Sequence, residues 1–312
     1  MKIGFGVDLG GTTVKIACFD EQGEMQSKWE IPTVTDGGGQ KILPDIATAI
    51  HSYIQKEKMD PADVLGVGIG VPGPVRPDGV VNKCVNLGWD VFHIENALNA
   101  LTGFPVKAGN DASVAALGES WVGGKGCENM VFVTLGTGVG GGIVVDGKLL
   151  YGTHGAGGEI GHMVMNPLET EQCTCGKYGC LEQYGSATGI VRVAKKHLEE
   201  KRVPSVLRNV EVLTCKDVFD AAKAKDRLAQ EILEEVFAYL GAAIANICNA
   251  VDPDAVVIGG GVSKAGQFLL EGVERHFQKH VFHAVSPVEI RLASLGNDAG
   301  AYGAFKLILD RN

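Results

Sequence analysis

The sequence predicts an α/β fold of two similar lobes, and three observations lead to this class. The first is a strand, a glycine-rich turn and a returning strand over residues 3–20. The second is a further copy of this pattern over residues 130–146. The third is that short apolar runs alternate with stretches of helical spacing along the rest of the chain. A length of 312 residues suits two such domains.

In the first copy, an apolar strand delivers Asp8 to the turn Gly10-Gly11-Thr12-Thr13. Such a turn points consecutive backbone N–H groups and small hydroxyls at an anion. An Asp beside it is well placed to act on a metal ion that accompanies phosphate. Taken alone, the segment fits equally well a tight hairpin whose Asp is buried or caps the turn.

The second copy lies at 133–138, which aligns with 7–12 without a gap, and the register continues from 17–20 to 143–146. Two such hairpins suggest two lobes that face each other across a central cleft and close on one nucleotide. That is the arrangement of the actin-like ATPase superfamily, whose lobes are ribonuclease H-like. We expect an N-terminal lobe at 1–122 and a C-terminal lobe at 123–297, divided at the glycine-rich stretch 123–126.

The remaining elements follow from the spacing of apolar residues and from Gly and Pro. Pro72-Gly73-Pro74 can continue neither a helix nor an inner strand, so it ends a buried strand. Strands are expected at 64–71, 106–111, 130–135, 255–258 and 288–292. Helices are expected at 41–58, 95–101, 112–121, 187–201, 216–224 and 226–251, then from the Gly259-Gly260-Gly261 run to His280, and at 299–309.

Composition excludes several classes of protein. The net charge is −9 and Lys and Arg form no run, so nucleic acid and anionic membranes are not expected as partners. The opening residues lack the apolar core of a signal peptide, and no stretch is long and apolar enough to span a bilayer. Eight cysteines, three of them in one loop, indicate reduced thiols and a metal site in a cytoplasmic protein.

That loop holds Cys173, Cys175 and Cys180 within eight residues, and His162 precedes them by eleven. Three thiolates and an imidazole make a closed tetrahedral zinc site. The spacing C-x-C-x-x-x-x-C is not that of a zinc finger, so a redox pair and three unconnected thiols are the alternatives. The tight cluster, flanked by Gly176 and Gly179, disfavours unconnected thiols.

Two matches to G-x-G-x-x-G, at 68–73 and 136–141, suggest a dinucleotide site at first sight. Such a turn must open a helix whose N-terminus meets the pyrophosphate. Ile143-Val144-Val145 follows one match and favours a strand, whereas Pro72 and Pro74 interrupt the other. A nicotinamide enzyme is therefore the weaker interpretation, and the sequence has no P-loop pattern either.

Four motifs together resemble a ROK-family sugar kinase, most of all the bacterial glucokinases of that family. They are Asp-Leu-Gly-Gly-Thr from Asp8, Leu-Gly-Thr-Gly-Val-Gly-Gly-Gly from Leu135, Gly-Glu-Ile-Gly-His ending at His162 and Cys-Thr-Cys-Gly-Lys-Tyr-Gly-Cys-Leu-Glu ending at Glu182. The resemblance runs over nearly the whole chain. It implies ATP-dependent phosphorylation of a hexose, with glucose first and N-acetylmannosamine or another hexose as alternatives.

The resemblance also implies how ATP is held. Phosphates would contact Gly10, Gly11, Thr12 and Thr13 in one lobe, and Thr137, Gly138, Gly140 and Gly141 in the other, with Mg²⁺ near Asp8. Gly260 and Gly261 would lie against the adenosine, although close packing of a helix on a strand explains them too. Lys15 points either to the phosphates or to solvent. The last helix, about 298–312, would pack back on the N-terminal lobe.

The sugar site is expected where a strand hands over to a helix at Asn110-Asp111. By resemblance, Asp111 is the base that takes the hydroxyl proton, although an Asp at this position is commonly a helix cap. Asn110 and Asn86 would be sugar ligands, and Gly73 would let the backbone approach the sugar.

The carboxylates of Glu159 and Glu182 would accept from sugar hydroxyls. If one ring nitrogen of His162 binds zinc, the other carries hydrogen and can donate to a sugar oxygen. Zinc is then structural and shapes the sugar pocket. A sugar-sensing repressor of the same family carries a DNA-binding segment before the first lobe, whereas the first strand here is expected at Ile3, so a kinase is favoured. Family habit suggests a homodimer or homotetramer.

Overall fold

The computed structural model describes residues 2–123 and 126–311, and the chain divides into two compact units. The first unit comprises Met1–Glu128, Gly142–Gly158 and Ser294–Asn312, and the second comprises Asn129–Gly141 and Glu159–Ala293. The segment Gly142–Gly158 thus belongs to the first unit, whereas the sequence placed it in the C-terminal lobe. The expected boundary at 123–126 falls partly on 124–125, outside the described residues.

The first unit is built on a five-stranded sheet in the order β3-β2-β1-β4-β7. Its strands are β1 (Ile3–Leu9), β2 (Thr13–Asp20), β3 (Met25–Pro32), β4 (Val64–Val71) and β7 (Val106–Asn110). β1 pairs antiparallel with β2 and parallel with β4, and β4 pairs parallel with β7. The carboxyl ends of β1, β4 and β7 therefore meet at one edge, where Asp8, Gly73 and Asn110 lie at or just beyond the strand ends.

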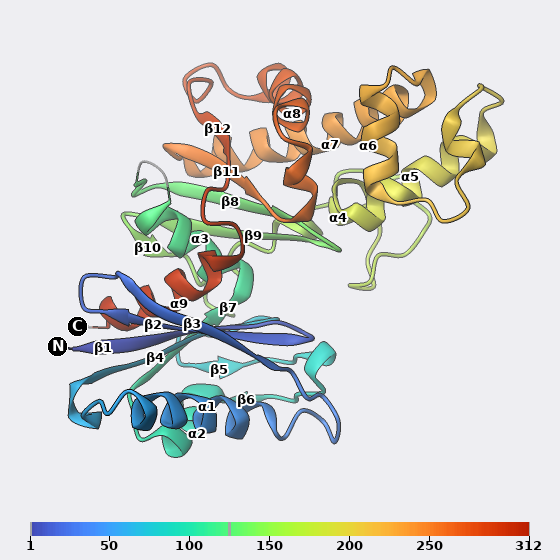
Figure 1. Cartoon of the computed structure of the whole chain (residues 1–312). Helices are drawn as coiled ribbons and strands as arrows, with labels where there is room; N and C mark the ends of the chain where they lie inside the picture. Colours follow the sequence, from blue (N-terminus) through green and yellow to red (C-terminus); the bar gives the residue numbers. More distant parts are fainter. Residues whose placement is uncertain (1, 124–125, 312) are drawn as a thin grey trace. The chain divides into compact units, whose positions relative to one another are not determined.

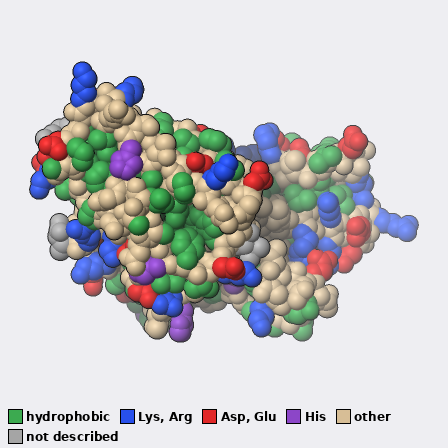
Figure 2. All heavy atoms as spheres, turned by 90° about the horizontal axis from the view of Figure 1, so that it is seen from below, with side chains coloured by type: hydrophobic (Ala, Val, Ile, Leu, Met, Phe, Trp, Pro, Cys, Tyr) green, Lys and Arg blue, Asp and Glu red, His purple; other side chains and the backbone are tan. Residues whose placement is uncertain are grey.

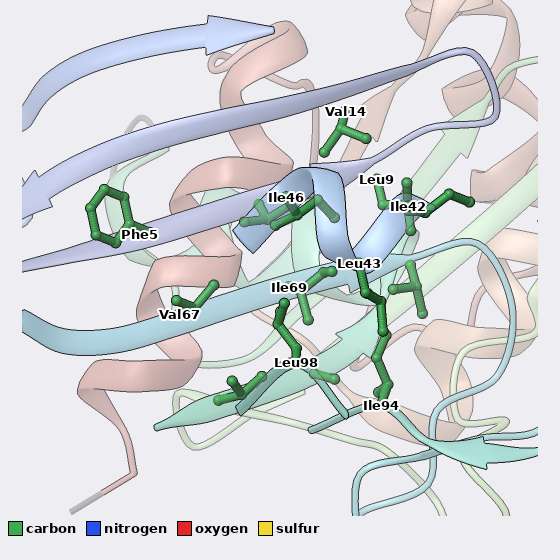
Figure 3. Packing of buried hydrophobic residues seen from close by; sticks show 14 of the residues in the cluster. Phe5, Leu9, Val14, Ile42, Leu43, Ile46, Val67, Ile69, Ile94 and Leu98 are labelled. Carbon is green, nitrogen blue, oxygen red and sulfur yellow. The ribbon is translucent and has the colours of Figure 1, made fainter. Parts of the chain in front are cut away.

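Helices α1 (Ile42–Lys56) and α2 (Ile94–Thr102) cover one face of this sheet, as Figure 1 shows. Apolar residues at helical spacing on α1 face the strands, and Figure 3 shows this core with Phe5, Leu9, Ile46, Ile69 and Leu98. The relative exposure of all five side chains is 0%. Burying one such side chain contributes roughly 1.5–3 kcal/mol to the stability of the fold. In Figure 2, the outer surface of this layer carries positive and negative side chains intermixed with hydrophobic ones.

Helices α3 (Asp111–Val122) and α9 (Ala299–Leu309) cover the opposite face. Phe305 of α9 stacks on Phe19 of β2 with ring centroids 4.9 Å apart. A Cβ at Gly68 would overlap with the Ala304 carbonyl, so only glycine lets the helix lie this close to β4. The buried carboxylate of Glu119 on α3 accepts hydrogen bonds from the chain leading into α9. These contacts hold the C-terminal helix in the first unit.

A second sheet has the order β10-β9-β8-β11-β12. Its strands are β8 (Met130–Leu135), β9 (Val139–Val145), β10 (Lys148–Leu149), β11 (Ala255–Gly259) and β12 (Glu289–Leu292). β11 is parallel to β8 and β12, as β4 is parallel to β1 and β7. The repeat seen in the sequence is therefore a repeat of strand order.

The helices of the second unit are α4 (Glu182–Gly185), α5 (Ala187–Glu200), α6 (Cys215–Lys223), α7 (Arg227–Val251) and α8 (Gln267–His280). Thr214 is the N-cap of α6 and forms a capping box, in which the Asp217 side chain accepts from the Thr214 backbone N–H. A two-stranded sheet of β5 (Val80–Val81) and β6 (Phe92–His93) belongs to the first unit. None of the helices within 2–123 and 126–311 combines the length and the hydropathy that crossing a membrane requires.

Candidate functional site

The turn between β1 and β2 is held from within and by β3. The Gly10 N–H donates to the Thr13 carbonyl at 3.0 Å, and the Thr33 N–H donates to the Thr12 carbonyl at 2.9 Å. Gly11 and Thr12 are exposed, and a Cβ at Gly11 would have no neighbour within 4 Å. The turn therefore presents backbone and a small hydroxyl to open space, as an anion site needs.

Asp8 lies at the base of this turn. Its carboxylate is 3.6 Å from the Lys15 ammonium, and a Cβ at Gly300 would come 2.7 Å from its Cγ. Burial raises the pKa of the Asp8 carboxyl above its ordinary value, and the Lys15 ammonium partly offsets this. Lys15 thus points toward Asp8 on the α9 side of the sheet, and its ammonium also lies 3.5 Å from the Asn297 carbonyl.

Asn110 and Asp111 lie where β7 hands over to α3. The cap of α3 is Asn110, whose side-chain oxygen accepts from the Ser113 N–H at 3.1 Å. The Asn110 amide also donates to the Gly73 carbonyl at 3.2 Å. Asp111 is the first helical residue, and its carboxylate accepts from the next backbone N–H, that of Ala112, at 2.8 Å. The residue after the cap, not the cap itself, is the one assigned as base.

Gly73 and the segment that holds Asn86 lie near this helix start. Gly73 has φ +122°, and a Cβ there would come 3.4 Å from the Lys83 carbonyl. Asn86 is exposed in the 3₁₀ helix Val85–Leu87. Burial raises the pKa of the neighbouring Cys84 thiol, and the Asp111 charge adds to this. The structure therefore brings the predicted sugar ligands of the first unit together at one edge of its sheet.

The turn between β8 and β9 is the counterpart in the second unit. The Gly136 N–H donates to the Gly138 carbonyl at 3.0 Å. The first residues of α5 approach it, because the Thr188 hydroxyl donates to the Thr137 carbonyl at 2.7 Å. Thr137 is exposed and Gly138 half-buried, whereas Gly140 and Gly141 lie within β9 and Gly141 is buried.

Gly260 lies beside this turn, at the end of β11. It has φ +84°, and a Cβ there would come 2.5 Å from the Leu135 carbonyl. The close-packing interpretation thus accounts for Gly260. Gly261 begins a 3₁₀ helix, Gly261–Ala265, and a Cβ there would have no neighbour within 4 Å. The helix expected directly after these glycines, α8, begins only at Gln267, since Gly266 at φ +71° separates the two helices.

The cysteine loop, which we define as residues 166–180, brings its thiols to His162. The ligand atoms of His162, Cys173, Cys175 and Cys180 all lie within 4.8 Å of one another. Sγ of Cys175 and Sγ of Cys180 are 3.6 Å apart, and Sγ of Cys173 is 4.0 Å from Nδ1 of His162. These separations suit four atoms that share one small metal ion.

The cysteine thiols influence one another's ionisation. Burial opposes ionisation of Cys175, but backbone N–H groups and the neighbouring thiols outweigh it and lower the Cys175 pKa. Burial and the other two cysteines raise the pKa of Cys180 to about 12. One thiolate therefore disfavours ionisation of the next thiol, whereas a cation among them would favour ionisation of all three. The donor set thus fits a divalent metal.

Glu159 and Glu182 flank this cluster. A Glu159 oxygen lies 3.9 Å from Nε2 of His162, the ring nitrogen that faces away from Cys173. Glu182 begins α4, and its carboxylate accepts from the Thr174 hydroxyl and from the Val139 N–H, both at 3.1 Å. Glu182 therefore connects the cysteine loop to the glycine turn, a role that its position in the sequence motif did not reveal.

Two further features escaped sequence reasoning. A pocket of about 530 Å³ adjoins the β8–β9 turn. It is lined by Thr137, Ala187, Thr188, Val191, Arg192, Lys195, Leu213 and Cys215. The other feature is a set of hydrogen bonds from Arg192 to the cysteine loop. Both rest on contacts between residues distant in the chain, for which the sequence has no periodic signal.

Comparison with known proteins places these features in a family. The ROK family model matches residues 4–311. A curated glucokinase from Halalkalibacterium halodurans is 45% identical over 309 residues, which cover 97% of this chain and 94% of that relative. A xylose repressor from Caldicellulosiruptor bescii is 29% identical over 97% of this chain and 77% of the repressor.

Among solved structures, a ROK family glucokinase from Streptomyces griseus in complex with glucose and AMPPNP has a TM-score of 0.76. It is 31% identical to this chain, and the alignment covers 98% of each protein. This likeness confirms the predicted fold class, the two-lobed actin-like ATPase fold of ROK sugar kinases.

Proposed function

The chain belongs to the ROK family, and from this premise we propose that it is a glucokinase, which converts glucose and ATP to glucose 6-phosphate and ADP. The observation that carries the proposal is the 45% identity to a curated glucokinase over 97% of the chain. The glucose and AMPPNP in the Streptomyces griseus structure support the same pair of substrates.

The nucleotide is bound by glycine turns in this proposal. In the first unit, the turn Gly10–Thr13, with Gly11 and Thr12 exposed, offers N–H groups and hydroxyls, and in the second unit the turn at Thr137 and Gly138 does so. The pocket beside Thr137 receives the adenosine, because Val191 and Leu213 give it apolar walls. Mg²⁺ would neutralise phosphate charge, and Asp8 is the carboxylate that would hold it.

Asp111 is the base. As the terminal phosphoryl group moves, the sugar hydroxyl oxygen bonds to phosphorus, the bond to the ADP oxygen breaks, and the hydroxyl proton passes to the Asp111 carboxylate. Asn110 caps the same helix and bonds to the Gly73 carbonyl, so the backbone around the carboxylate is fixed. Such rigidity keeps the carboxylate oriented toward the hydroxyl.

Zinc is the metal that we propose for the thiol cluster, with His162, Cys173, Cys175 and Cys180 as its ligands. It would crosslink the cysteine loop to the segment of His162. Because Nδ1 of His162 faces Cys173, Nε2 is left to carry hydrogen and to donate to a sugar oxygen or to Glu159. Glu159 and Glu182 then accept from sugar hydroxyls.

A second candidate is a sugar-sensing transcriptional regulator, which the likeness to a xylose repressor favours. A third, within the same chemistry, is a kinase for N-acetylmannosamine or another hexose. The homodimer or homotetramer and the cytoplasmic location stay predictions.

An assay of ADP release with purified protein tests these candidates together. We expect release in the presence of glucose, with kcat/KM for glucose at least about ten-fold above that for N-acetylmannosamine and xylose. Preference for another hexose would replace glucose in the proposal. Binding of sugar without any ADP release would favour the regulator.

A further inference from the structure

We propose that Arg192 and Glu169 form a clamp that positions the cysteine loop, and with it the sugar ligand Glu182. The proposal rests on the function proposed above. Neither residue belongs to the motifs or to the four candidate metal ligands, so both are positioning residues.

Glu169 is the loop side of the clamp. Its side chain is 6% exposed, so its charge needs partners within the protein. The Tyr184 hydroxyl donates to one carboxylate oxygen at 2.6 Å, and Nη2 of Arg192 donates to the same oxygen at 2.7 Å. The other oxygen accepts from the backbone N–H groups of Thr170 and Glu171. Every side of the carboxylate is therefore used to shape the loop.

Arg192, on α5, is the scaffold side. Besides Glu169, its guanidinium donates to Glu171 at 2.8 Å and to the Gln183 carbonyl at 3.2 Å. It lies over the Tyr184 ring, 5.1 Å from the centroid. A planar group with several fixed donors can bind two carboxylates and a carbonyl at once, which a lysine cannot. The loop is thus bound to α5 at two of its own residues.

Gln183 completes the clamp at the far end of the loop. Its side-chain oxygen accepts from the N–H groups of Gly179 and Cys180, at 2.8 and 3.1 Å, and its amide donates to the Glu171 carbonyl at 2.9 Å. Both stretches that flank the cysteines are therefore fixed from α4 and α5. Since Glu182 precedes Gln183 directly, the same bonds set the place of Glu182.

Tyr184, which bonds to Glu169, is itself fixed by its neighbours. Tyr184 packs on Tyr239 of α7 with ring centroids 4.0 Å apart, and it also accepts a hydrogen bond from the Asn166 amide at 2.9 Å. Its position is thus set by the core helix of the unit. Outer partners of this kind hold ligands in geometry that the ligands alone do not maintain.

The test uses Glu169→Gln in the full-length protein, because Glu169, unlike Arg192, does not line the pocket beside Thr137. Amide hydrogen exchange over residues 166–180 should accelerate by about ten-fold or more, and zinc release to a chromophoric chelator should accelerate likewise. KM for glucose should rise by about ten-fold while KM for ATP changes less than about two-fold.

Glu234→Gln is the matched control, since Glu234 pairs with Arg275 and His276 of α8 in the same unit. It should leave loop exchange and zinc release unchanged. Tyr184→Phe, which removes a single hydroxyl, should reproduce the Glu169→Gln effects in weaker form and serves if Glu169→Gln does not fold. In a double variant Glu169→Gln/Arg192→Gln, the increase in loop exchange should be smaller than the product of the two single increases, because the two residues share one direct contact.

Loop exchange equal to that of the control, or an increase spread evenly over the whole unit, would overturn the clamp. Hydrogen exchange needs neither zinc nor a sugar. If the wild-type protein phosphorylates no sugar, the proposed function fails, and the exchange comparison still decides whether the clamp exists.

Discussion

Asn110 and Asp111 are adjacent residues with distinct places at the start of α3, and the difference bears on mechanism. An Asp at a helix start is commonly its cap, which was the alternative to a catalytic role. Here the Asn110 side chain caps the helix through the Ser113 N–H. The Asp111 carboxylate is therefore not needed as the cap, which supports its assignment as the base.

Replacing Asp111 by Asn tests that assignment. We expect Asp111→Asn to lower kcat by roughly 10²- to 10⁴-fold, because the amide cannot take up the hydroxyl proton. KM for glucose should change little, since the amide keeps the shape of the carboxylate. Steady-state kinetics with glucose and ATP would measure both constants. Asp45→Asn on α1 is the control and should leave kcat unchanged. An unchanged kcat in Asp111→Asn would mean that another group is the base.

Gly11 offers a contrasting test at the phosphate turn. A Cβ there has no neighbour within 4 Å, so Gly11→Ala should alter the unfolding free energy by less than about 0.5 kcal/mol. In the proposed nucleotide site, the methyl group would nevertheless lie between the turn and the phosphates. We expect KM for ATP to rise by about ten-fold with KM for glucose unchanged, as measured by initial rates. An unchanged KM for ATP would remove this turn from the nucleotide site.

At the scale of elements, the cysteine loop depends on a charge that is ionised at neutral pH. Burial alone would raise the pKa of Glu169, but the bonds from Arg192 and Tyr184 outweigh burial and lower it to about 2. An acid whose pKa is lower in the folded state stabilises the fold above its ordinary pKa and loses this effect as pH falls.

Glu169→Gln should therefore lower the unfolding free energy at pH 7 by on the order of 3 kcal/mol. The difference in unfolding free energy between variant and wild type should narrow by about 1 kcal/mol from pH 5 to pH 3.5, as the pH falls past the ordinary pKa toward the lowered one. Urea unfolding at each pH measures it. A gap independent of pH would mean that the Glu169 charge contributes nothing.

The sequence predicts some elements better than others, for physical reasons. Helices such as α1 and α7 bury one continuous apolar face, so their spacing places them within two residues of the observed bounds. β3 has alternating exposure at the edge of its sheet and escaped prediction, as did β10, which has only two residues. Gly140 and Gly141, expected in the turn, belong to β9, because the β-branched residues Ile143, Val144 and Val145 continue the strand after Gly142.

The site divides in the same way. Local motifs place Asp8, Asp111 and the cysteines, because each lies in a short pattern with its own chemistry. No local motif indicates the clamp. Glu169 and Arg192 are 23 residues apart in sequence and meet only after α4 and α5 fold against the loop. No local motif indicates the pocket beside Thr137 either, because its walls come from three separate segments.

At the scale of the whole molecule, one strand order occurs twice. The β3-β2-β1-β4-β7 and β10-β9-β8-β11-β12 sheets each begin with a hairpin whose turn carries glycine. The sequence repeat preserves only the hairpin, whereas the repeat of strand order extends over five strands. Each unit therefore has one glycine turn, which follows β1 in the first unit and β8 in the second.

The proposed zinc should stabilise the whole fold, because a metal crosslink between His162 and the cysteine loop would form only in the folded chain. Cys175→Ser should lose zinc and glucose affinity together, and a chelator should lower Tm and glucose affinity in the wild type. Metal analysis, thermal unfolding and glucose titration measure these effects. Cys215→Ser, outside the cluster, should change neither. If Cys175→Ser retained zinc and bound glucose normally, the proposed dependence of glucose binding on zinc would be wrong.

Under the proposed function, this protein esterifies the terminal hydroxyl of glucose with phosphate from ATP. ³¹P NMR of the purified protein with glucose, ATP and Mg²⁺ observes donor and product together. We expect the ATP signals to be replaced by those of ADP and glucose 6-phosphate in equal amounts. Two results would contradict glucokinase activity. One is that ATP persists with glucose but is consumed with a different sugar, and the other is that ATP is converted to ADP and free phosphate.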